Sequence, residues 1–108
     1  MSLTAEPASC TIPAGGGSST HKLVNSGAEK LIFKIKSSNN TDYRITPVFG
    51  FIEPSGIKEM LIIRLSGPPK EDKIVVHFAN APADAADAQA AFAGITPVGT
   101  FTIPVSAV

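Results

Sequence analysis

The sequence offers few side chains that could carry out catalysis. Nucleophilic catalysis needs a serine or cysteine, a base and an orienting carboxylate held close together. The only histidines are His21 and His77, and the single cysteine is Cys10. The two histidines fall on different expected strands, and no G-x-S-x-G, H-E-x-x-H or phosphate-loop pattern occurs in the sequence. The sequence therefore predicts a protein that is not an enzyme.

Two other stretches have simple structural explanations. Residues 15–19 read GGGSS but lack the lysine and helix that follow a phosphate loop, so we expect a flexible turn. Asp84 and Asp87 lie in an alanine-rich segment, and a metal site needs more converging ligands than two carboxylates. Helix capping or solvation is the expected role of these aspartates. One cysteine can form neither an internal disulfide nor a cysteine cluster, so we expect no metal and no cofactor.

The stretch EKLIFKIKSSNN, residues 29–40, is more informative. Its period of two predicts a strand with an apolar inner face made of Leu31, Phe33 and Ile35. The outer face carries Lys30, Lys34 and Lys36, and the strand ends in the hydroxyls of Ser37 and Ser38. Lysines on adjacent strands would concentrate positive charge on one patch of a neutral protein. The alternative is that the lysines only keep the strand face solvated and guard a sheet edge.

Similar alternation recurs along the chain and predicts an all-β protein. The run DKIVVHFAN places Ile74, Val76 and Phe78 inward, with Lys73, Val75 and His77 outward. The run EMLIIRLS groups Leu61, Ile63 and Leu65 inward, and TFTIPVSAV groups Phe101, Ile103 and Val105 inward. Turn residues separate these runs at short intervals. Roughly seven short strands at this spacing predict a β-sandwich.

Length and composition limit the class of protein further. The chain has 108 residues, which suits one domain over residues 1–108 with a loose N-terminus at residues 1–6. An alanine-rich segment predicts a short helical connection near residues 82–93. Nine basic and nine acidic side chains balance, so there is no global charge to attract nucleic acid or an acidic membrane. No secretory signal or long apolar run is visible, so we expect a cytoplasmic protein without membrane insertion.

Three quoted stretches, taken in order, resemble the major sperm protein domain family. KLVNSGAEKLIFKIKSSNN (22–40) is similar to the family's strand, Asn-Ser turn, strand and lysine-hydroxyl ending. YRITPVFGFIEPSG (43–56) is similar to its V-x-P-x-x-G-x-[IL]-[DE]-P stretch, and DKIVVHFANAP (72–82) to its late strand and helical connection. The resemblance covers most of residues 8–108 and is greatest to the small sperm-specific members of nematodes. It implies an immunoglobulin-like seven-stranded β-sandwich.

The middle stretch also has a physical interpretation of its own. Pro47 and Pro54 are rigid corners, and we expect Gly50 to adopt backbone angles that other residues resist. These residues predict a turn of the chain between the two sheets.

The adapter branch of the family implies a receptor for linear peptides. There a basic face holds an acidic, phenylalanine-bearing peptide, and the matching residues here are Lys34, Lys36, Ser37, Ser38 and Lys73. Val75 stands where those adapters carry a methionine. Valine is shorter and stiffer, so it fills an aromatic pocket less adaptably.

The cytoskeletal branch implies self-association into dimers and filaments. We expect Met60 and Ile62 to be exposed opposite the inward Leu61 and Ile63, which makes them candidates for a homodimer contact. A neighbouring loop could equally bury them. The leading interpretation is a non-enzymatic protein–protein interaction or structural domain of nematode sperm, cytoskeletal or signalling. A receptor for acidic phenylalanine-containing peptides is the alternative.

Overall fold

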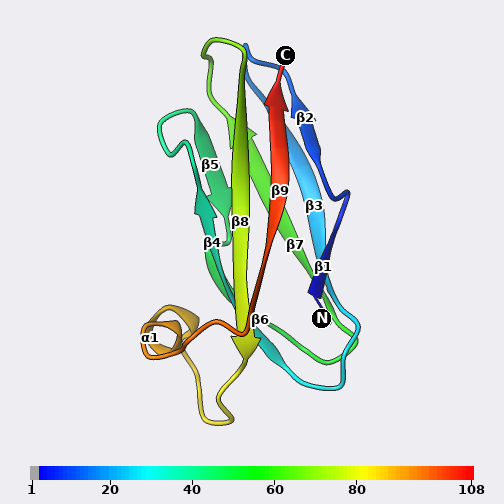
Figure 1. Ribbon diagram of the computed structural model, residues 1–108, viewed down its shortest axis with the longest axis vertical. Coiled ribbons are helices and arrows are strands. Elements are labelled where there is room, and N and C mark those ends of the chain that lie inside the picture. Colours follow the sequence, from blue (N-terminus) through cyan, green and yellow to red (C-terminus); the bar gives the residue numbers. More distant parts are fainter. Residues whose placement is uncertain (1–2) are drawn as a thin grey trace.

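A computed structural model describes residues 3–108 as two stacked β-sheets and one short helix (Figure 1). The four-stranded sheet has the order β1-β3-β7-β5, and the five-stranded sheet has the order β2-β9-β8-β4-β6. The strands are β1 (Leu3–Glu6), β2 (Cys10–Ile12), β3 (Gly17–Asn25), β4 (Leu31–Ser37), β5 (Tyr43–Thr46), β6 (Phe49–Ile52), β7 (Ile57–Arg64), β8 (Lys70–Asn80) and β9 (Gly99–Ala107). The helix is α1 (Ala88–Phe92). The predicted immunoglobulin-like β-sandwich is confirmed.

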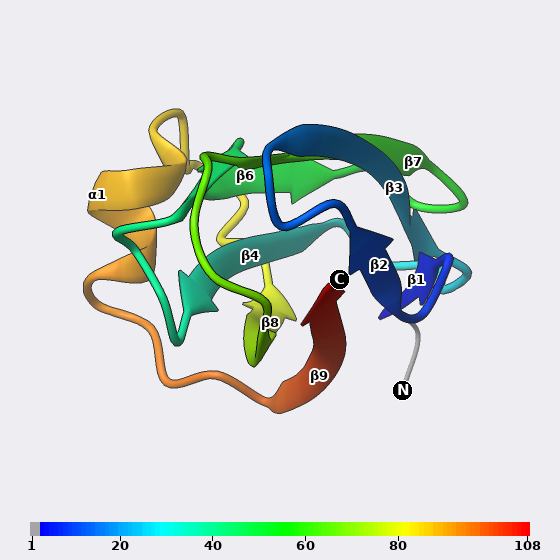
Figure 2. The same cartoon turned by 90° about the horizontal axis from the view of Figure 1, so that it is seen from above.

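The core lies between the two sheets, which form separate layers when the molecule is seen from above (Figure 2). The inner face of β4 consists of Leu31, Phe33 and Ile35, and that of β8 consists of Ile74, Val76 and Phe78. Both sets are buried as the alternation predicted. The outer faces of both sheets are left for other contacts, except where α1 covers part of the five-stranded sheet.

Two chain segments cross from one sheet to the other. Residues 3–12 form β1 in the four-stranded sheet and β2 in the five-stranded sheet, with Pro7 between them. Residues 43–52 do the same with β5 and β6 on either side of Pro47. Proline cannot donate to a strand ladder, so pairing stops where each segment changes sheet. The predicted seven segments therefore appear as nine strands among residues 3–108, and the predicted turn between sheets lies at Pro47.

Gly50 is required by a close approach rather than by its backbone angles. A Cβ atom there would lie 2.7 Å from Cζ of Phe33, and the φ angle of Gly50 is not in the left-handed region. Gly50 is directly opposite Phe33 in the β4–β6 ladder. The bare backbone therefore makes room for the ring in the core.

The expectation of a loose N-terminus is wrong for residues 3–6. These residues form β1, which pairs antiparallel with β3. Leu3 and Ala5 are buried in the core, and this burial holds the strand in place. Residues 1 and 2 lie outside the described part of the chain.

The predicted orientation of β7 is also wrong. Met60 and Ile62 are fully buried, whereas Ile63 is 36% exposed, so the homodimer contact expected at Met60 and Ile62 is not available on the surface. The cause is the register with β3, which places Glu59 directly opposite Lys22. Directly opposite residues share a face, and these two charges belong in water, so Leu61 and Ile63 face outward with Glu59.

The helix α1 falls inside the predicted connection and covers part of the five-stranded sheet. Asp87 caps it by accepting hydrogen bonds from the backbone N–H groups of Gln89 and Ala90, at 3.0 and 3.3 Å. Phe92 packs against Ile32 and forms a second small apolar cluster outside the main core. Within residues 3–108, no helix has the length and hydropathy needed to cross a membrane.

Candidate protein-interaction face

The outer face of the five-stranded sheet gathers the lysines of β4 and β8. The lysine face is defined here as Lys34, Lys36, Lys73, Val75 and His77. In the β4–β8 ladder, Lys34 lies opposite His77 and Lys36 lies opposite Val75. Lys73 is one outward position further along β8, beside the end of β4. The structure thus places these side chains on one face of one sheet, and peptide binding there stays a prediction.

The positive charges of this face are not neutralised within the described chain. Among residues 3–108, the ion pairs join Lys30 to Glu53 at 3.6 Å and Lys70 to Asp72 at 3.7 Å. None of the three lysines of the lysine face takes part in an ion pair in this part of the chain. Lys36 and Lys73 are exposed, and Lys34 is half-buried. Their charges are thus available to a partner from solvent.

The pKa of His77 is affected by the positive charges of this face. Burial lowers the pKa of His77, and the positive charges of Lys36 and Lys34 lower it further. His77 is consequently neutral near pH 7 and adds a hydrogen-bonding ring between the lysines. His77 is not among the candidate peptide-binding residues that the family resemblance implies. The period of two in the sequence did predict that it faces outward with Lys73 and Val75.

The lysine face has clear boundaries. At one end, the Lys34 ammonium lies 5.5 Å from the ring centre of Phe49, and α1 covers the sheet beyond it through Phe92. At the other end, Glu71 precedes Lys73 on β8 and accepts a hydrogen bond from the hydroxyl of Ser106. A partner lying along β8 would therefore meet an acid at one end and an aromatic cluster at the other.

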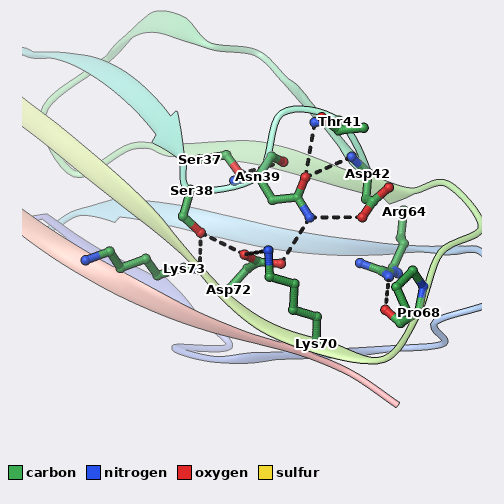
Figure 3. Close-up of polar contacts among 10 residues, drawn as sticks. All are labelled: Ser37, Ser38, Asn39, Thr41, Asp42, Arg64, Pro68, Lys70, Asp72 and Lys73. Atoms are coloured by element: carbon green, nitrogen blue, oxygen red, sulfur yellow. Dashed lines mark hydrogen bonds and ion pairs between the residues drawn. The ribbon is translucent and has the colours of Figure 1, made fainter.

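The two serines at the end of β4 have structural partners. Ser38 donates to Oδ1 of Asp72 at 3.0 Å and accepts from the backbone N–H of Lys73 at 3.0 Å (Figure 3). The Ser37 hydroxyl bonds to the backbone carbonyl and N–H of Asn39, both at 3.1 Å. The two hydroxyls matched to the lysines by the sequence pattern are thus engaged within the chain, whereas Lys34, Lys36 and Lys73 form no ion pair among residues 3–108.

Asn39 connects these elements. Its Nδ2 group donates to Oδ2 of Asp42 at 3.1 Å and to Oδ2 of Asp72 at 3.2 Å (Figure 3). Its Oδ1 atom accepts from the backbone N–H groups of Thr41 and Asp42, at 3.1 and 3.0 Å. One buried amide therefore ties the loop after β4 to the start of β8. Local sequence pattern does not indicate this link, because Asn39 and Asp72 lie 33 residues apart.

Other polar groups form no catalytic arrangement in the described chain. His21 is fully buried; its Nδ1–H donates to the carbonyl of Pro7 at 2.8 Å, and its Nε2 accepts from Ser19 at 2.9 Å. Burial raises the pKa of the Cys10 thiol, and this effect is larger than the lowering caused by a hydrogen bond with Ser19. The raised pKa disfavours the reactive thiolate. Within residues 3–108, no group of three or more His, Cys, Asp or Glu side chains could hold a metal ion.

An open hollow of about 790 Å³ lies between β6 and α1, beyond the end of the lysine face marked by Phe49. Its charged side chains are partly committed, since Lys30 pairs with Glu53 and Asp87 caps α1. Its apolar part consists of Val48, Phe49 and Phe51. The hollow brings together no nucleophile and base.

Comparison with known proteins agrees with this fold. A family model for the MSP (major sperm protein) domain matches residues 2–97. The chain belongs to the MSP domain family. Among its relatives, sperm-specific class P protein 16 of Caenorhabditis elegans is 74% identical over 107 residues, which cover 99% of this chain and 98% of that protein.

Solved structures of this family have the same architecture. SSP-19, an MSP-domain protein like family member in C. elegans, superposes with a TM-score of 0.97 and 69% identity, over 98% of this chain and 99% of that chain. The C. elegans MSP family member WR4 gives a TM-score of 0.94 at 40% identity, over 99% and 98% of the two chains. The resemblance inferred from the three quoted stretches is thereby confirmed.

Proposed function

We propose that this MSP domain is a non-enzymatic interaction domain of nematode sperm whose lysine face binds an acidic segment of a partner protein. One observation carries the proposal: Lys34, Lys36 and Lys73 share a sheet face and form no ion pair within residues 3–108. A neutral protein with one local cluster of free positive charge attracts acidic partners to that cluster.

The geometry indicates how an extended acidic segment would lie. Val75 lies opposite Lys36 and is half-buried, so it forms a small apolar contact area between Lys36 and Lys73. A partner's phenylalanine can cover Val75 while its carboxylates reach Lys36 and Lys73. Val75 is short and has a fixed χ1, so this apolar contact is shallow and the lysines supply most of the selectivity.

The serines take a different role in this proposal from the one implied by the family resemblance. Their hydroxyls already bond to Asp72 and Asn39, so they shape the end of β4 rather than contact the partner. Asp72 thereby sits where an incoming carboxylate would otherwise bond to Ser38. The partner's acids are directed toward the lysines.

The sperm setting of the proposal comes from the relatives. Several of them are sperm-specific class P proteins of C. elegans, which supports the sperm setting. The cytoplasmic, cytoskeletal or signalling role is the one that the family resemblance implies. The non-enzymatic assignment is supported by the setting of the Ser19–His21 hydrogen bond, the serine–histidine pair described above. The His21 ring is fully buried, and a backbone carbonyl rather than a carboxylate holds its Nδ1 atom.

A binding titration tests the proposal. A fluorescent acidic peptide containing one phenylalanine is titrated with the protein at several salt concentrations. Binding should weaken as salt rises, and Lys36→Ala and Lys73→Ala should each weaken it by about threefold or more. Lys22→Ala is the matched control, because Lys22 is an exposed strand lysine on the other sheet. Absence of binding, or an equal loss with Lys22→Ala, would refute the proposal.

A further inference from the structure

Strand β9 has an open edge along the part that precedes Val105. In the five-stranded sheet β9 lies between β8 and β2, but β2 pairs only with Val105, Ser106 and Ala107 near the C-terminal end (Figure 1). The cause is the first crossover, because the chain before β2 changes sheet at Pro7 and β1 pairs with β3 instead. Within the described chain, residues 99–104 therefore have no strand on the side away from β8.

The backbone groups that face this open edge can be assigned from the ladder with β8. Lys73 lies opposite Pro104, and its N–H donates to Oγ of Ser38 while its carbonyl accepts from the Ser38 N–H, both at 3.0 Å. The polar backbone groups of Lys73 thus point away from β9, and those of Pro104 point away from β8. A proline suits that position because it has no N–H to leave unpaired. Every second residue repeats the orientation, so the N–H and C=O groups of Thr100 and Thr102 face the open edge.

These groups are not used elsewhere in the described chain. Among residues 3–108, no backbone hydrogen bond outside the strand ladders involves Thr100 or Thr102. Both side chains are exposed. A row of free N–H and C=O groups on a strand edge is a template for another extended chain.

A small uncharged hollow lies beside this edge, between β9 and β1. Its volume is about 290 Å³, and its lining consists of Leu3, Thr4, Ala5, Ala8, Phe101 and Thr102. None of these six residues carries a charge. Phe101 is half-buried, and its ring centre lies 6.2 Å from that of Phe78 in the core. The hollow therefore suits an uncharged apolar side chain.

The open part of β9 is longer than the other sheet edges. The strands β1, β5 and β6 have four residues each and β2 has three, whereas the open part of β9 spans residues 99–104. Short edge strands are one way in which proteins avoid unwanted pairing. Val98, directly before the open part, is 62% exposed and adds apolar surface next to it.

We propose that an extended segment of a partner protein adds to the open edge of β9 as a further strand and places an uncharged apolar side chain in the hollow between β9 and β1. In strand addition, main-chain hydrogen bonds supply affinity and a pocket for one side chain supplies selectivity. Here Thr100 and Thr102 supply the main-chain groups. Only an extended chain presents the matching row of donors and acceptors, so the occupant is a peptide segment. The uncharged lining distinguishes it from the acidic segment proposed for the lysine face.

Amide hydrogen exchange measured by NMR tests this strand addition directly. The probe is a capped, uncharged peptide, Thr-Ser-Thr-Leu-Thr-Ser-Thr, with two further versions that carry glycine or aspartate in place of leucine. At saturation the leucine peptide should slow exchange of the Thr100 and Thr102 amides by about tenfold or more. The amides of Phe101 and Ile103 face β8 and are the internal control, with little change expected. The glycine and aspartate peptides should each bind at least about threefold more weakly than the leucine peptide.

Two substitutions at one position separate the main chain from the side chain. Thr102→Pro removes an edge-facing N–H and should weaken leucine-peptide binding by about tenfold, whereas Thr102→Val keeps the N–H and should bind within about twofold of the unmodified chain. Pro104 shows that β9 accommodates proline at this orientation. Ala8→Phe fills the hollow from an exposed position and should weaken binding by about fivefold. Thermal unfolding of each variant verifies that the fold is retained.

Three results would overturn the proposed strand addition. They are no protection of Thr100 and Thr102 by any of the three peptides up to about 5 mM, equal affinity for the leucine and glycine peptides, or equal affinity of Thr102→Pro and Thr102→Val for the leucine peptide. The proposal does not rest on acidic-peptide binding. Lys36→Ala should leave leucine-peptide binding unchanged, which separates failure of one proposal from failure of the other.

Discussion

Ser38 donates a hydrogen bond of 3.0 Å to Asp72, a residue 34 positions later in the chain (Figure 3). The same hydroxyl accepts from the backbone N–H of Lys73 at 3.0 Å. A residue that resembles part of a binding motif is thus a link between β8 and the loop after β4. The neighbouring lysines form no ion pair among residues 3–108, so in the proposed binding mode the structural role and the binding role belong to different residues.

This division can be measured with two single variants. Ser38→Ala should lower the free energy of unfolding by about 0.5–1.5 kcal/mol, because it removes two hydrogen bonds, and should leave acidic-peptide affinity unchanged. Lys36→Ala should do the reverse, with weaker peptide binding and little change in stability. Urea denaturation and peptide titration of the same samples make the comparison. A Ser38→Ala variant that loses peptide affinity while remaining folded would show that the hydroxyl contacts the partner.

Asn39 should be the most sensitive residue of the loop after β4. Asn39→Ala removes the two donors to Asp42 and Asp72 and leaves their carboxylates less satisfied, so we expect a loss of about 1–3 kcal/mol in unfolding free energy. Asn40→Ala is the control, because the side chain of this neighbouring residue is exposed. The Asn40→Ala substitution should change the unfolding free energy by no more than about 0.5 kcal/mol. Urea midpoints at constant slope provide both values. Equal midpoints for the two variants would contradict the role given to Asn39.

The orientation of β7 can be tested with two neighbouring isoleucines. Ile62 is fully buried and Ile63 is 36% exposed, although they are identical in chemistry. Ile62→Ala should lower the unfolding free energy by about 2–5 kcal/mol, whereas Ile63→Ala should lower it by less than about 1 kcal/mol. Chemical denaturation at low protein concentration measures both without a contribution from association. The opposite ranking would restore the orientation expected from the sequence.

The β7 result shows where the sequence alone is insufficient. In the segment from Met60 to Leu65, apolar side chains occupy both odd-numbered and even-numbered positions. Alternation alone therefore fits a strand with either set of side chains facing the core. The choice is made by strand pairing, because Glu59 and Lys22 occupy the same row and must share the solvent face. Arg64 is then buried, donating to the backbone carbonyls of Ala14 at 3.3 Å and Pro68 at 2.7 Å. A buried arginine is not expected from hydropathy.

Where apolar and polar residues alternate cleanly, the sequence predicted the fold correctly. Lys34 and Lys36 alternate with Phe33 and Ile35, and only one orientation keeps the charges in water. The roles of Ser37 and Ser38 could not be obtained in this way. Their partners depend on how the loop after β4 folds back on β8, which local pattern does not encode.

His77 provides a test of the local electrostatic field. Its pKa should lie below the ordinary value of about 6.5, chiefly because of burial, and Lys36→Met and Lys34→Met should each raise it toward that value. NMR titration of the imidazole resonances measures the three pKa values directly. A value above the ordinary one in the unmodified chain, or no change in either variant, would contradict the positions assigned to these lysines.

The same shift has a defined effect on stability. The unfolded chain binds a proton at His77 from about pH 6.5 downward, while the folded chain binds it only at lower pH. Stability should therefore decrease as pH falls through this window and be unaffected by His77 above it. His77→Gln should reduce this decrease relative to the unmodified chain, and since His21 is present in both proteins, the difference isolates His77. Urea midpoints from pH 7.5 to 5 measure it.

The central claim is that the lysine face is where an acidic partner binds. The most direct measurement is an amide chemical-shift titration of the labelled protein with the acidic phenylalanine-containing peptide. The largest saturable shifts should fall on the outward positions of β4 and β8, including Lys36, Lys73 and Val75, and should decrease as salt is added. Shifts concentrated on the outward residues of β3 and β7 or on the hollow beside α1, or no saturable shifts at all, would contradict the claim.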